Sequence, residues 1–97
     1  MIKPGPRNLL TDVDGLMVGN AADSAARSGV TVVMAEDGAV ASGDVRGAAP
    51  GTRETDLLDP TCMIERIDAV CLSGGSVYGL AAGDAVVRWL YDHERGF

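Results

Sequence analysis

The chain has 97 residues, of which 46% are hydrophobic and 23% are charged, and its net charge is −6. This length allows one small domain, and the composition is typical of a folded chain rather than a disordered one. The basic residues are isolated among acidic ones, which disfavours binding to nucleic acid or to an anionic membrane. All four aromatic residues lie at position 78 or later. The core of the first 70 residues is therefore thin and aliphatic, and we expect the native chain to continue or to associate.

Residues 1–9 contain Pro4 and Pro6, which predict an extended lead-in. A signal peptide needs an apolar run at this place, and a bilayer span needs a longer one; neither pattern is present. We therefore expect a cytoplasmic protein that does not bind membranes. Residues 16–20, LMVGN, predict a short strand, and residues 22–29 predict a polar loop or a single turn.

Two further strand patterns follow. Residues 30–35, VTVVMA, are β-branched and apolar, which is typical of a strand buried on both faces. The turn signal EDG at 36–38 precedes a weaker strand pattern at 39–45, so residues 30–45 are predicted to form a β-hairpin. Residues 67–73, IDAVCLS, predict another apolar strand.

Helical patterns appear in the second half of the chain. Asp59 followed by Pro60 is typical of an N-cap and a first helical position, so a short helix is expected to begin there and to include TCMIERI. From Ser76 to His93 apolar residues recur at three- and four-residue spacing, which predicts a long amphipathic helix. The order of the elements favours the α+β or the α/β class, in one domain over residues 1–97.

The sequence CLSGGSVYGLAAG, residues 71–83, runs from a predicted strand into the predicted helix and resembles three functional turns. A P-loop would need Lys and Ser or Thr where this chain has Leu and Ala, and a dinucleotide-binding turn would follow the first strand of the chain. A nucleophile elbow would need Gly in place of Tyr78, and the only histidine, His93, is predicted to lie about 25 Å from Ser76. Two interpretations remain, a structural turn in which Ser76 caps the helix and a helix start that lines a binding site.

Asp12 and Asp14 lie in LLTDVDG, which resembles the DxDG signature of dehalogenase-type phosphatases. There the first Asp is the nucleophile and the second is the acid–base group. The preceding segment is broken by prolines, so a turn is favoured over the phosphatase hypothesis. Cys62, Cys71 and a single histidine are too few ligands for a zinc site; we expect two buried thiols and no metal.

Residues 44–60, DVRGAAPGTRETDLLDP, predict a long irregular loop. Its charged residues Arg46, Arg53, Glu54 and Asp56 lie among small residues, so we expect ion pairs across the loop. A loop of this length commonly has a binding or interface role, and the alternative is a solvated charged loop.

Four motifs, in order and without large gaps, carry a resemblance to a known family. They are GPRNLLTDVDGLMVGN, GVTVV, VRGAAPGTRETDLLDP and IDAVCLSGGSVYGLAAGDAVVRWL. From about Gly5 to Phe97 the chain resembles the N-terminal part of the DmpA-type aminopeptidases, the L-aminopeptidase/D-esterase-amidases. These enzymes are related to β-peptidyl aminopeptidases and nylon-oligomer hydrolases.

The resemblance implies a four-layer αββα sandwich, of which this chain is the N-terminal part, and a homo-oligomeric enzyme without metal or cofactor. It also implies a precursor that cleaves itself into two chains, in which the new N-terminal Ser or Thr of the second chain is the nucleophile. That nucleophile is expected beyond Phe97, so no catalytic residue is assigned to this chain. Gly74, Gly75, Ser76 and Tyr78 are candidates for substrate binding.

The first hypothesis is therefore the N-terminal segment of a serine aminopeptidase that acts on small peptides, amides or esters. Its partner would be the remainder of its own precursor, and the 97-residue chain alone is expected to be inactive. A non-catalytic fragment that serves structure or assembly is the alternative, and the phosphatase that uses Asp12 and Asp14 is a remote one.

Overall fold

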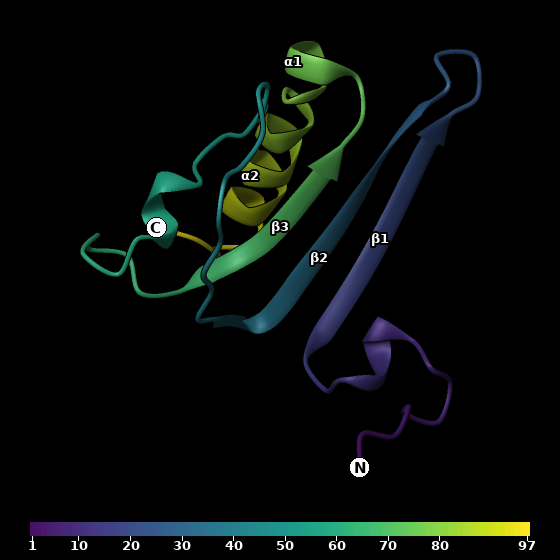
Figure 1. The fold of residues 1–97 in the computed structure, drawn as a ribbon, viewed down its shortest axis with the longest axis vertical. Coiled ribbons are helices and arrows are strands. Elements are labelled where there is room, and N and C mark those ends of the chain that lie inside the picture. The colour runs from purple at the N-terminus through teal and green to yellow at the C-terminus, as the bar shows by residue number, and fades with distance from the viewer.

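Three antiparallel strands form the centre of the computed structural model, which describes residues 1–97 (Figure 1). β1 (Leu16–Asp23), β2 (Ser28–Ala39) and β3 (Ile67–Ser73) lie in the order β1-β2-β3, so both β1 and β3 are edge strands. A helix, α2 (Ala82–Asp92), contacts β3. The antiparallel sheet with its helices confirms the α+β class.

β1 and β2 form a hairpin whose turn is residues 24–27, and not the EDG segment that the sequence predicted. The strand predicted over 16–20 is confirmed and extends to Asp23. The carboxylate Oδ1 of Asp23 accepts hydrogen bonds from the amides of Ala25 at 2.9 Å and Ala26 at 3.0 Å. This side chain replaces the bonds that a strand ladder would give to these amides, so the chain turns here.

The EDG segment lies inside β2, where the pairing with β3 is irregular. A side-chain nitrogen of Arg66 donates to the carbonyl of Gly38 at 2.8 Å, and one of Arg95 donates to the carbonyl of Ala35 at 2.6 Å. Two arginines thus satisfy carbonyl groups that the distorted ladder leaves open. Strand structure ends at Ala39, so the strand predicted over 39–45 is wrong, whereas the one over 67–73 is confirmed.

The helical elements are short. Two single 3₁₀ turns, η1 (Leu10–Asp12) and η2 (Asp56–Leu58), precede the α-helix α1 (Ser76–Gly79) and α2. The predicted 76–93 helix is therefore divided into α1 and α2. The two residues between them keep right-handed helical backbone angles.

The short helix predicted from Pro60 is absent. Oδ1 of Asp59 accepts hydrogen bonds from the amide of Thr61 at 2.8 Å and from its hydroxyl at 2.7 Å, which closes a local turn. Asp59 therefore does not cap a helix. The prediction failed because an Asp–Pro pair is also a common turn sequence.

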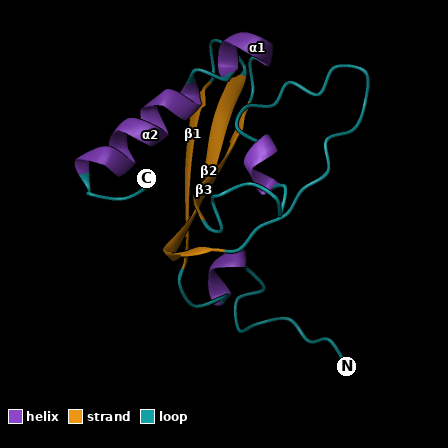
Figure 2. Ribbon diagram, turned by 90° about the vertical axis from the view of Figure 1, so that its left-hand side faces the viewer, coloured by secondary structure: helices purple, strands orange, loops and turns teal.

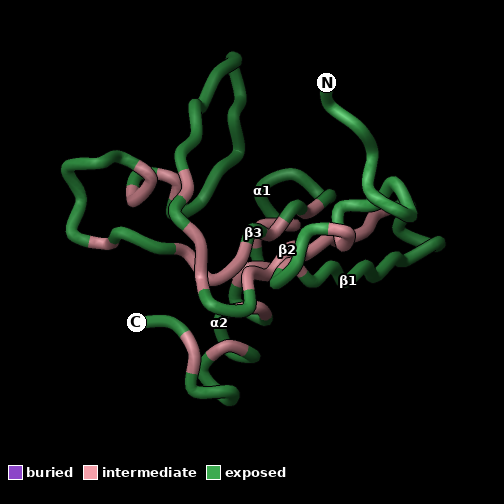
Figure 3. The backbone as a smooth tube through the Cα atoms, turned by 90° about the horizontal axis from the view of Figure 1, so that it is seen from below, coloured by how far each residue is buried: buried purple, intermediate pink, exposed green.

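No residue of the chain is buried, and Figure 3 shows only intermediate and exposed segments. Val70 and Leu72 on β3 are 43% and 60% exposed, and because they are two residues apart they point to the same face of the sheet. The expected buried thiols are wrong, since Cys62 is exposed and Cys71 is half-buried. An α+β chain of this composition with an unburied sheet has an incomplete core, as the scarcity of aromatic residues predicted.

Figure 2 shows the sheet nearly edge-on, with α2 on one side and much of the long loop, residues 40–66, on the other. A helix that could span a bilayer is not found, since α2 has only 11 residues.

Candidate functional site

The candidate site is built around the connection from β3 to α1, residues 74–76. The amide of Gly74 donates to the carbonyl of Gly29 at 2.9 Å, which continues the sheet by one step beyond β3. Gly75 then adopts φ +96° and reverses the chain. The amide of Gly79 donates to the carbonyl of Gly75 at 3.0 Å, which closes the helical turn.

The close approach of α1 to the end of β3 requires a glycine at position 79. A Cβ atom at Gly79 would lie 1.7 Å from the carbonyl oxygen of Gly74, far inside van der Waals contact. At Gly75 the positive φ favours glycine for a different reason, because a Cβ atom clashes with its own backbone there. The GGSVYG sequence is thus explained by close packing of a strand end on a short helix.

One interpretation of the sequence was that Ser76 caps the helix, and the structure shows that it does not. The N-cap residue is Gly75, and no side chain makes a capping hydrogen bond. Ser76 is the first helical residue, with φ +57°, and it is exposed. His93 lies just beyond α2, where its ring stacks on Trp89 with 3.8 Å between ring centroids. Ser76 makes no hydrogen bond with it, so the structure contains no serine–histidine pair.

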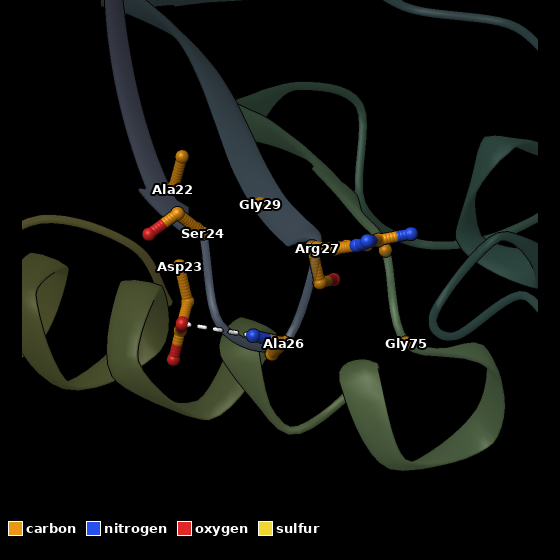
Figure 4. Close-up of a pocket in the computed structure, with 9 residues that line it drawn as sticks. Ala22, Asp23, Ser24, Ala26, Arg27, Gly29 and Gly75 are labelled. Atoms are coloured by element: carbon orange, nitrogen blue, oxygen red, sulfur yellow. Dashed lines mark hydrogen bonds between the residues drawn. The ribbon is translucent and has the colours of Figure 1, made fainter.

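An open hollow of about 710 Å³ lies between the β1–β2 turn and this connection (Figure 4). Gly74 and Gly75 line it, whereas Ser76 and Tyr78 do not. Tyr78 is 89% exposed. The structure therefore brings two of the four predicted binding residues into one concave surface.

The other half of the hollow comes from the β1–β2 turn and was missed by the sequence analysis. Its polar side chains are those of Asp23, Ser24, Arg27 and Ser28. The hydroxyl oxygen of Ser28 would lie 2.6 Å from a Cβ atom at Gly74, so the turn and the connection are in close contact. The pairing of β2 with β3 places the start of β2 beside the end of β3. The predicted hairpin over residues 30–45 hid this proximity, because it gave β2 a different partner.

The long loop contains the four charged residues for which the sequence predicted ion pairs. Only one of them forms an ion pair with a residue outside the loop. Arg53 donates to the carboxylate of Asp84 on α2 at 2.6 Å. This hydrogen bond, and then the charge of each partner, lowers the pKa of Asp84 and raises that of Arg53. Arg46 pairs with nearby Asp44 at 2.5 Å.

The remaining marked loop residues have local roles. Glu54 adopts φ +58°, and Asp56 begins η2. Ion pairs across the loop were predicted. The structure shows one short-range pair within the loop and one pair that connects it to α2.

The side chain of Asp12 stabilises the local turn of the N-terminal segment. Its side chain is 8% exposed, and Oδ2 accepts hydrogen bonds from the amides of Arg7 at 3.0 Å and Leu9 at 3.1 Å. The amide of Leu9 and then the amide and guanidinium of Arg7 lower the pKa of Asp12. Asp14 is exposed, and the hydrogen-bond partners of Asp12 are Arg7 and Leu9. This arrangement agrees with the predicted turn and disfavours the phosphatase hypothesis. The His, Cys, Asp and Glu side chains form no group of three that could hold a metal ion.

Residues 8–96 match the sequence profile of Peptidase family S58. A protein of Mycobacterium leprae, named an uncharacterized aminopeptidase, is 47% identical over 104 residues, which cover 99% of this chain and 29% of that protein. Uncharacterized aminopeptidases of Mycobacterium bovis and Mycobacterium tuberculosis are each 50% identical over 97 residues, which cover 92% of this chain and 28% of theirs. The chain thus spans less than a third of the length of these curated relatives.

Proposed function

Because the chain belongs to peptidase family S58, the family of the DmpA-type aminopeptidases that its motifs resemble, we propose that the complete polypeptide is an aminopeptidase. It removes N-terminal residues from small peptides, amides or esters. The observation that carries this proposal is the match over residues 8–96, together with relatives named aminopeptidases at 47% and 50% identity.

The proposed nucleophile is the N-terminal Ser or Thr of a second chain, produced when the precursor cleaves itself. Its hydroxyl oxygen attacks the substrate carbonyl, and its own α-amino group or a neighbouring side chain accepts the proton. The amine leaves with a proton, and water then hydrolyses the acyl-enzyme ester. This mechanism is the one that the resemblance to the DmpA-type aminopeptidases implies.

The proposed role of residues 1–97 is to form one part of the scaffold of a four-layer αββα sandwich. The absence of any buried residue supports this role, because a sheet with an exposed apolar face is stabilised when a second layer covers it. The covering layer would be the remainder of the precursor. We propose a homo-oligomer without metal or cofactor, as the family resemblance implies, and a cytoplasmic location.

The test is to express the natural full-length polypeptide and to examine it by denaturing electrophoresis and by hydrolysis of alanine p-nitroanilide and alanine methyl ester. We expect two chains and hydrolysis of at least one substrate. N-terminal sequencing of the second chain identifies the nucleophile, and its substitution by Ala is expected to abolish both activities. A single unprocessed chain that hydrolyses neither substrate would refute the proposal.

The second candidate function is a non-catalytic fragment that serves structure or assembly. The observation that favours it is the same exposed apolar surface, which includes Val70 and Leu72. This candidate predicts that the native product is a single chain of about 10 kDa, found in a larger assembly by gel filtration and without hydrolytic activity. Two chains on the denaturing gel would exclude it.

A further inference from the structure

Arg27 differs from every other arginine of the chain because it has no acceptor. The other six arginines donate either to a carboxylate or to backbone carbonyls. Arg27 is in none of these hydrogen bonds or ion pairs, although Asp23 is only four residues away. The Asp23 carboxylate is occupied by the amides of the turn instead.

Arg27 is one of the residues that line the hollow. Figure 4 shows its side chain extending from the turn toward the segment that carries Gly75, whereas the side chain of Asp23 points in another direction. The amide of Gly75 has no hydrogen-bond acceptor in the structure. The hydroxyls of Ser24 and Ser28 also have no partner. The hollow thus gathers unused hydrogen-bond donors around one free positive charge.

This set of groups matches a carboxylate. A guanidinium can donate two parallel hydrogen bonds to a carboxylate, and hydroxyl or amide donors can complete the shell. The formal charges of the hollow sum to zero, because Asp23 and Arg27 are its only charged residues. The charge of Asp23 disfavours a dianionic phosphate, whereas a ligand with a single carboxylate matches the one guanidinium of Arg27.

We propose that this hollow binds the free carboxylate of an amino acid or short peptide through Arg27, with Ser28 and the amide of Gly75 as further donors. The inference rests on the proposed function in one respect, since the substrates and products of an aminopeptidase carry such a carboxylate. It adds a specificity: short peptides with a free C-terminus are preferred over their amides.

The first experiment uses the full-length protein and measures kcat and KM for alanyl-alanine and for alanyl-alanine amide. Arg27→Gln is expected to raise KM for the dipeptide about tenfold, the size of one lost charge-assisted hydrogen-bonding contact. KM for the amide is expected to remain unchanged, as is kcat for both substrates. Arg27→Lys, which retains the charge, should recover part of the loss. Arg88→Gln, on the exposed surface of α2, is the matched control and should behave like the wild type.

The second experiment is independent of catalysis. Alanine is titrated into the same protein while the amide resonance of Gly75 and the side-chain Nε resonance of Arg27 are followed by NMR. We expect both to shift in a saturable manner, and the shift of Gly75 to be lost in Arg27→Gln. Circular dichroism of the variant verifies that it is folded.

The outcomes separate the two proposals. Saturable alanine binding without hydrolysis of any peptide would remove the proposed function and leave the carboxylate site. Hydrolysis with no resonance shift at Gly75 or Arg27 would remove the carboxylate site and leave the function. An equal rise of KM for the dipeptide and for its amide would also overturn the site, because a structural effect of Arg27 does not distinguish the two substrates.

Discussion

The sheet and the long loop are held by different forces, although they are neighbours in the chain. Residues of β1, β2 and β3 are joined by a ladder of backbone hydrogen bonds, which continues through Gly74. The loop, residues 40–66, has no such ladder. Away from its base, where Arg66 donates to carbonyl groups of β2, the pair of Arg53 and Asp84 is its salt bridge to the rest of the fold.

This difference indicates which changes the molecule tolerates. Backbone hydrogen bonds do not depend on side-chain identity, so the sheet is sensitive mainly where a side chain would collide with the backbone. A loop fixed by an exposed ion pair has little energy to lose, because such pairs contribute little in water. We therefore expect large stability effects at the β3–α1 connection and effects on local mobility in the loop.

The largest effect is expected for Gly79→Ala. Its new methyl group would collide with the carbonyl of Gly74, so α1 must move away from β3, at a cost of about 3 kcal/mol of unfolding free energy. Urea denaturation of the full-length protein measures this. Gly19→Ala is the matched control, because no atom lies within 4 Å of a Cβ there, and it should change stability by less than about 0.5 kcal/mol. Equal effects of the two substitutions would contradict the packing argument.

A smaller effect is expected for Asp23→Ala in the β1–β2 turn. It removes the acceptor for the amides of Ala25 and Ala26, which should lower the free energy of unfolding by about 1 kcal/mol. Asp14→Ala removes an exposed carboxylate of the same charge that makes no hydrogen bond, so it serves as the control in the same urea titration. If both variants lost equal stability, the cause would be charge and not the turn.

The loop is tested by Arg53→Gln. We expect little change in the unfolding midpoint, because the ion pair is exposed, and faster hydrogen exchange at the amides of Leu58 and Asp59, whose hydrogen bonds close the turn η2. Hydrogen exchange read by mass spectrometry measures this. Arg46→Gln removes a pair inside the loop and should leave the exchange at Leu58 and Asp59 unaffected. A drop in the unfolding midpoint as large as that of Gly79→Ala would refute the distinction between sheet and loop.

The smallest effect concerns pH. The hydrogen bond from Arg53 and its charge lower the pKa of Asp84, so the contact stabilises the folded loop above the ordinary carboxyl value of about 4 and is lost as pH falls through the lowered value. NMR titration of the Asp84 carboxyl measures this. Arg53→Gln should raise the pKa of Asp84 and leave that of Asp12 unchanged, because the amide of Leu9 is the main cause there. No change at Asp84 would show that the ion pair is absent in solution.

Several features follow from the sequence alone. The apolar runs LMVGN, VTVVMA and IDAVCLS predicted three strands that the structure confirms. The motifs around them predicted the family whose profile residues 8–96 match. The scarcity of aromatic residues predicted an incomplete core, and no residue is buried. These properties depend on local side-chain chemistry and on composition, which the sequence states directly.

Tertiary structure decided the pairing of the strands and therefore the site. EDG and ADSAAR are both acceptable turn sequences, and long-range contacts, among them those of Arg66 and Arg95 with carbonyl groups of β2, hold the first inside the strand. That choice places the turn with Arg27 beside Gly74 and Gly75, residues more than 40 positions later in the chain. Local propensity could not determine this proximity, because it results from hydrogen bonds between segments distant in sequence.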